Sequence, residues 1–150
     1  MTSRGEPAQA PADGSQPAAP AEADVAPADG QHLRHVIRRL LTPARAGLFL
    51  SRDDLERLSA ALGFVLPALD RRIMLEHLFV AAGPAGLLPR LLDLMAAEAD
   101  GWIATYREWE TSYPHTAAIW ADWRGRAEAL RADLAALRVE AERAASSPPR

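Results

Sequence analysis

The chain has 150 residues, enough for one domain, with no cysteine and a formal net charge of −3 at neutral pH. The missing cysteine excludes disulfides, thiolate metal sites and cysteine nucleophiles. No window holds the roughly 18 uninterrupted apolar residues of a membrane-spanning helix, so we predict no membrane association and expect a cytoplasmic protein.

Residues 1–30 form an acidic arm that is rich in Ala and Pro, with Val25 as its only branched aliphatic residue. Arg4 is its single basic residue, against five acidic ones: Glu6, Asp13, Glu22, Asp24 and Asp29. Such a composition cannot bury enough apolar surface to offset the loss of chain entropy. We therefore predict a disordered arm over 1–30, a helical bundle domain over 31–145 and a disordered tail over 146–150.

Three short helices are predicted in the first half of the domain, over residues 31–41, 52–62 and 67–82. Their apolar residues recur at intervals of three and four, which is typical of amphipathic helices. Thr42–Pro43 ends the first helix, and Ser51 followed by Asp54 resembles a capping box for the second. Pro67 is acceptable in a first helical turn, so we place the start of the third helix there.

Residues 87–145 are predicted to form a long antiparallel helical hairpin. Intervals of four and three alternate through one run of apolar residues: Leu88, Leu92, Met95, Ala99, Trp102, Tyr106, Trp109 and Tyr113. After Pro114 the same coiled-coil-like spacing resumes in a second run: Trp120, Trp123, Ala127, Leu130, Leu134, Leu137, Ala141 and Ala144. Because a short proline turn leaves the two helices side by side, the sequence predicts an all-α fold, a small bundle of about five helices.

Aromatic residues gather near the turn of this hairpin, where residues 101–123 hold all four Trp and both Tyr. They could form a stacking pocket for a planar ligand over residues 102–123, or they could be core. Their helical spacing favours core packing, and Leu91, Ile103 and Ile119 widen the apolar face beyond a two-helix contact. A wide face of this kind predicts a mainly monomeric bundle with at most a weak dimer.

No pattern of catalytic or metal-binding residues is present. His32 and His35 are spaced by three on one helix, but two ligands do not make a zinc site. The sequence has no Lys, no G-x-S-x-G and no phosphate loop. We therefore predict a protein that is not an enzyme and that holds no cofactor and no metal.

A helix-turn-helix DNA-binding regulator is the alternative function. Residues 52–80 give a helix, Gly63, a short turn and a helix that carries Arg71 and Arg72. Residues 31–72 hold eight Arg against four acidic residues, and this net charge of +4 suits a phosphate backbone. However, the turn "FVLP" is unusually apolar, and Arg72 occupies a position where a buried apolar side chain is expected. These features disfavour nucleic acid as a partner.

A non-enzymatic protein–protein interaction module, an adaptor or accessory subunit, is the leading functional prediction. Small helical bundles without a catalytic pattern most often bind other proteins. Arg124, Arg131 and Arg138, spaced by seven on the polar face of the hairpin, are the predicted partner-binding residues. The sequence does not identify the protein partner.

Overall fold

The computed structural model describes residues 28–146, with side chains described from Gly30 onward. This part of the chain contains no strand and six α-helices: α1 (Ala28–Leu41), α2 (Pro43–Ala46), α3 (Arg52–Ala61), α4 (Arg71–Ala82), α5 (Leu88–Ser112) and α6 (Ala117–Ser146). The predicted all-α bundle with a long C-terminal hairpin is confirmed. The arm over 1–30 and the tail over 146–150 lie almost entirely outside the described residues.

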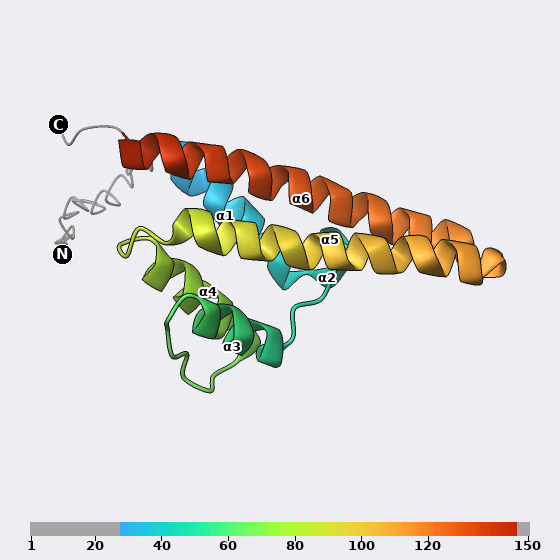
Figure 1. Ribbon diagram of the computed structural model, residues 1–150, viewed down its shortest axis with the longest axis horizontal. Coiled ribbons are helices and arrows are strands. Elements are labelled where there is room, and N and C mark those ends of the chain that lie inside the picture. Colours follow the sequence, from blue (N-terminus) through green and yellow to red (C-terminus); the bar gives the residue numbers. More distant parts are fainter. Residues whose placement is uncertain (1–27, 147–150) are drawn as a thin grey trace, which may run out of the picture.

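Helices α5 and α6 run side by side along the whole length of the molecule (Figure 1). With 25 and 30 residues, they are about 38 and 45 Å long at a rise of about 1.5 Å per residue. Helix α5 continues through Gly101, as its apolar spacing predicts. The backbone leaves the helical region at Tyr113 (φ −127°, ψ 70°), and a 3-10 turn, Pro114–Thr116, joins the two helices.

The four shorter helices pack along one half of the hairpin. Helices α1 and α2 contact α6, α4 contacts α5, and α3 packs on α4. The turn end of the hairpin extends beyond these four helices (Figure 1). The largest fully buried side chains come from every helix except α2 and from the segment after it: Leu40, Leu48, Leu50, Leu55, Met74, Leu75, Leu78, Leu91, Leu92, Met95, Leu130 and Leu134.

The capping box predicted for α3 is present, since Ser51 Oγ accepts from the Asp54 amide and Asp54 accepts from the Ser51 amide. The predicted start of the next helix is wrong. Helix α4 begins at Arg71, and Asp70 caps it by accepting a hydrogen bond from the Arg72 amide at 2.9 Å. A carboxylate that satisfies a free amide determines this helix start, whereas Pro67 has no side chain that could do so. The connection between α3 and α4 therefore spans the nine residues 62–70.

Tyr113 and Ile119, which the apolar spacing placed on the buried face, are exposed, and so is Phe49. Tyr113 is 57 % exposed, Ile119 is 53 % exposed, and Phe49 is 48 % exposed although its neighbours Leu48 and Leu50 are buried. Tyr113 and Ile119 flank the turn of the hairpin, beyond the reach of the shorter helices. The apolar spacing therefore identified the helix face correctly, but the face is covered only where another element packs on it.

Candidate binding site

The aromatic residues near the hairpin turn pack mainly on one another. Tyr106 is 3 % exposed and stacks on Trp120 with the ring centroids 6.3 Å apart, while Trp109 meets Trp120 edge-on at 4.7 Å. The Tyr106 hydroxyl donates a 2.6 Å hydrogen bond to the carbonyl oxygen of Gly47, and burial raises the pKa of Tyr106. This packing accounts for the helical spacing of the rings.

Gly47 brings the short helix α2 into contact with the hairpin. Its backbone is left-handed (φ 74°), and a Cβ atom there would overlap the backbone of Trp123 and Ala127 in α6. Only glycine meets both requirements, because it lacks the Cβ atom and adopts positive φ readily. The close approach fixes α2, and with it Ala44 and Arg45, against the side of α6.

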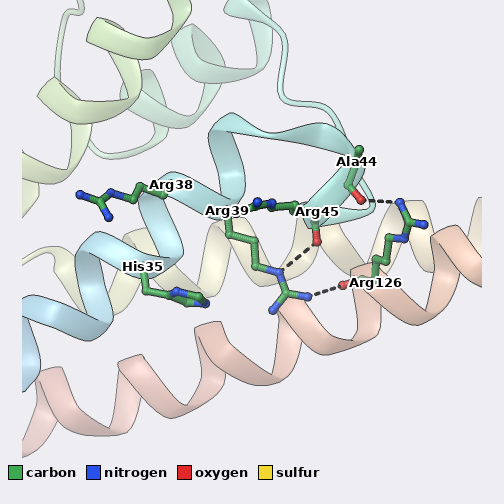
Figure 2. Close-up of a pocket in the computed structure, with 6 residues that line it drawn as sticks. All are labelled: His35, Arg38, Arg39, Ala44, Arg45 and Arg126. Atoms are coloured by element: carbon green, nitrogen blue, oxygen red, sulfur yellow. Dashed lines mark hydrogen bonds between the residues drawn. The ribbon is translucent and has the colours of Figure 1, made fainter.

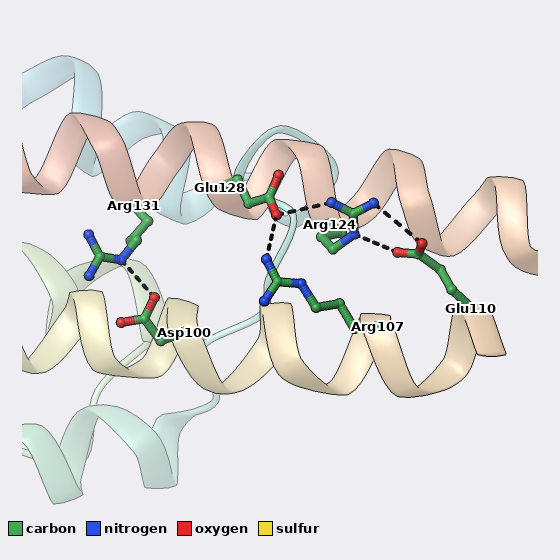
Figure 3. Close-up of polar contacts among 6 residues, drawn as sticks. All are labelled: Asp100, Arg107, Glu110, Arg124, Glu128 and Arg131. Atoms are coloured by element: carbon green, nitrogen blue, oxygen red, sulfur yellow. Dashed lines mark hydrogen bonds and ion pairs between the residues drawn. The ribbon is translucent and has the colours of Figure 1, made fainter. Parts of the chain in front are cut away.

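The three arginines predicted to bind a partner form ion pairs inside the hairpin. Arg124 contacts Glu110 at 2.6 Å and Glu128 at 3.0 Å, and Arg131 contacts Asp100 at 2.7 Å (Figure 3). The hydrogen bond from Arg124 lowers the pKa of Glu110.

Arg138 lies 2.6 Å from Asp93 and 3.0 Å from Glu142, which completes the row. Each of the three arginines therefore joins α6 to a carboxylate of α5. A role in partner binding stays a prediction for them, and a partner would have to compete with these intramolecular carboxylates.

Arg71 and Arg72, the predicted residues of the DNA-binding alternative, also form contacts within the chain. Arg71 donates to the carbonyl oxygen of Leu41 at 2.9 Å, and its guanidinium lies 4.9 Å from the centroid of the Phe49 ring. Arg72 forms an ion pair with Glu76 at 3.3 Å. Moreover, helix-turn-helix motifs use a turn of about three or four residues, much shorter than the connection over 62–70.

The two histidines of α1 have different neighbours. His32 Nδ1 lies 3.0 Å from both carboxylate oxygens of Glu140 in α6, whereas His35 points into a cleft one turn further along α1. Among residues 28–146, no group of three or more His, Asp or Glu side chains is arranged to hold a metal ion.

A basic cleft, which the sequence analysis did not predict, lies where α1, α2 and α6 meet (Figure 2). It has a volume of about 500 Å³ and is lined by His35, Arg38, Arg39, Ala44, Arg45 and Arg126. Four guanidinium groups therefore surround one hollow. Arginine pairs readily with carboxylates and phosphates through its planar fork of donors, so an anion is the natural ligand.

Two of the cleft arginines hold the structure together. Arg39 donates to the carbonyl oxygens of Arg45 and Arg126 at 3.1 and 3.2 Å and pairs with Asp133. Arg126 donates to the carbonyl oxygen of Ala44 and pairs with Asp122. These hydrogen bonds tie α1, α2 and α6 together and so fix the positions of Arg39 and Arg126 in the wall of the cleft.

The other two, Arg38 and Arg45, are exposed and have no ion-pair partner within residues 28–146. The carboxylates of Asp133 and Asp122 compensate Arg39 and Arg126 only. A net positive charge of two guanidinium groups therefore remains at the cleft.

The net charge of +4 over residues 31–72 was the one sequence feature that pointed to this cleft. Arg38 and Arg45 are seven residues apart, but they lie on different helices, α1 and α2, which are separated by Thr42. Arg126 comes from α6 and is distant in sequence. Only the packing of α2 against α6, which depends on Gly47, brings these residues together.

No protein-family model, curated protein or solved structure matches this chain. None of the helices within residues 28–146 is both long enough and apolar enough to cross a membrane.

Proposed function

We propose that the chain is a non-enzymatic protein-interaction module, an adaptor or accessory subunit, and that its basic cleft binds an acidic segment of a protein partner. The uncompensated charge of Arg38 and Arg45 carries this proposal. Both side chains are exposed beside a wall fixed by Arg39 and Arg126, so a ligand can reach them without breaking an internal ion pair.

An acidic peptide fits the cleft better than a nucleic acid does. A duplex presents a long row of phosphates and calls for an extended basic surface. Here the cleft presents two uncompensated guanidinium groups, those of Arg38 and Arg45, and the chain as a whole carries −3. Carboxylates on a protein segment can pair with two guanidinium groups locally and leave the acidic remainder of the surface out of contact.

Peptide binding by the full chain tests the proposal directly. Fluorescein-labelled hexaglutamate should bind in a fluorescence anisotropy titration at low ionic strength, and uncharged hexaglutamine should not. Binding should weaken toward physiological salt, because exposed charges are screened over a Debye length of about 8 to 10 Å. The absence of hexaglutamate binding, or tighter binding of a short DNA duplex, would contradict the proposal.

The double variant Arg38→Ala with Arg45→Ala should weaken hexaglutamate binding about tenfold, since two exposed charge pairs of under about 1 kcal/mol each are lost. Arg52→Ala with Arg90→Ala is the matched control. Those two arginines are exposed, lack ion-pair partners in the described part of the chain and lie outside the cleft. Equal weakening by both pairs would mean that net charge, not the cleft, governs binding.

We also propose that the chain is mainly a monomer at micromolar concentration. The two runs of apolar residues that face each other in α5 and α6 form the seam of the hairpin. This seam is already buried within one chain, with Leu130, Leu134 and Leu137 at most 3 % exposed. Sedimentation velocity should give a single species of about 16 kDa. A tight dimer would contradict this assignment.

A further inference from the structure

The segment that precedes α1 carries a charge opposite to that of the cleft. Residues 1–27 contain Glu6, Asp13, Glu22 and Asp24 against Arg4 alone, a net charge of −3. This segment joins α1 at Ala28, and α1 itself forms one wall of the cleft. We infer that the acidic segment, residues 1–27, binds the basic cleft of its own chain and competes there with the acidic partner. This inference rests on the proposed function.

The lengths involved permit the contact. His35 and Arg38 follow Ala28 by seven and ten residues, or about 10 and 15 Å along the helix at about 1.5 Å per residue. An extended chain covers up to about 3.5 Å per residue, so Glu22 can lie about 21 Å from Ala28. Glu22 therefore reaches Arg38 when the chain doubles back along α1. Residues further from the helix, such as Asp13, reach the far side of the cleft without full extension of the chain.

The charges along α1 favour this path. Arg34 is exposed and lies one turn before Arg38 on the same side of the helix. Together they extend the positive charge of the cleft toward Ala28. Arg45 on α2 then presents the next uncompensated guanidinium.

Covalent attachment compensates for the weakness of exposed charge pairs. A short tether gives an effective concentration in the millimolar range, so even a segment of low intrinsic affinity occupies its site for much of the time. A partner must bind the cleft more tightly than the tethered segment does in order to displace it. Such a partner needs more carboxylates than the segment itself offers. The acidic segment thus sets a threshold that excludes weakly acidic ligands from the cleft.

Paramagnetic relaxation enhancement tests the contact in the full chain without any partner. The chain has no cysteine, so Ala18→Cys provides a unique site for a nitroxide label. The label should broaden the backbone amide signals of Arg38, Arg45 and Arg126 at low ionic strength, and high salt should restore them. Unbroadened signals at low ionic strength would overturn the inference, whether or not the cleft binds a partner.

Competition provides the second test. Asp13→Asn, Glu22→Gln and Asp24→Asn together make residues 1–27 neutral, because Arg4 and Glu6 then cancel. The full chain with these three changes should bind hexaglutamate at least about threefold more tightly than the native chain, since the tethered competitor is removed.

The matched control is Asp53→Asn, Glu56→Gln and Glu108→Gln, which changes the net charge equally. These three carboxylates are exposed and have no ion-pair partner within the described residues. Equal tightening in both triple variants would overturn the inference and leave the proposed function standing. Absence of hexaglutamate binding in every variant would instead contradict the proposed function, while the nitroxide experiment would still decide whether the segment contacts the cleft.

Discussion

The two halves of the hairpin bury different kinds of side chain. Next to α1–α4, the seam is aliphatic, and Leu92, Met95 and Leu134 are at most 1 % exposed. Toward the turn, the seam is aromatic, and only Tyr106 of its six rings is buried. The four tryptophans of this half are partly exposed.

This difference follows from how many elements cover each half. Aliphatic side chains are compact, and a third and fourth helix close over them. Fewer elements cover the aromatic half, and among them are α2 and the segment around Gly47. Large flat rings can fill the space between two helices by edge-on and stacked contacts, and each buries about 150 to 250 Å². The hairpin therefore stays paired beyond the point where the bundle ends.

Leu134→Ala should have the largest effect, because it opens a cavity where every side of the residue is covered. We expect a loss of about 4 kcal/mol in the free energy of unfolding, against about 2 kcal/mol for Trp120→Ala, whose ring is already partly exposed. Urea denaturation followed by circular dichroism measures both. A larger loss for Trp120→Ala would show that the aromatic half is the main core.

Gly47→Ala tests the close contact between the segment at Gly47 and the aromatic half of the hairpin. The added Cβ atom overlaps the backbone of α6 and forces a positive φ on a residue that disfavours it, so we expect a loss of about 3 kcal/mol. Gly63→Ala is a useful control, because Gly63 also has positive φ (81°) but open space around it. The difference between the losses of unfolding free energy in the two variants measures the cost of the overlap with α6. Equal losses would mean that backbone strain alone accounts for Gly47.

Much of the hairpin was predictable because its two helices repeat one spacing without interruption. The ion pairs between them were predictable too, although the sequence analysis did not find them. Asp93 and Asp100 are seven residues apart, as are Arg131 and Arg138, so one antiparallel register brings both pairs together. The spacing of the arginines alone does not show these carboxylate partners, because the partners lie on the other helix of the hairpin.

The start of α4 and the basic cleft could not be read from local patterns. Asp70 and Pro67 both suit a helix start, so the local pattern leaves two positions open; in the structure the Asp70 side chain caps the helix by accepting from the Arg72 amide. The cleft requires Arg38, Arg45 and Arg126 to meet across three helices, which no spacing along the chain encodes. Such a site depends on the path of the backbone at Gly47, which the apolar spacing of the chain does not specify.

Tyr106→Phe removes the hydrogen bond that joins the aromatic half of the hairpin to the segment at Gly47. The ring and its packing remain, but the carbonyl oxygen of Gly47 loses a buried donor at 2.6 Å. We expect a loss of about 1 to 2 kcal/mol. The same variant should also weaken hexaglutamate binding modestly, since α2 positions Arg45. Unchanged stability would indicate that water replaces the hydroxyl.

Gly125→Ala should have the smallest effect and the opposite sign. Gly125 lies inside α6 near the aromatic half, and a Cβ atom there would meet nothing within 4 Å. Because Ala exceeds Gly in helix propensity by about 1 kcal/mol, the helix should be stabilised by about that amount. If the sparsely covered half opens without the rest of the molecule, the gain should appear there first, as amide hydrogen exchange about fivefold slower around Trp120 and Trp123. Exchange slowed equally at Leu134 would show instead that both halves open together, and the difference in burial would then have no counterpart in local stability.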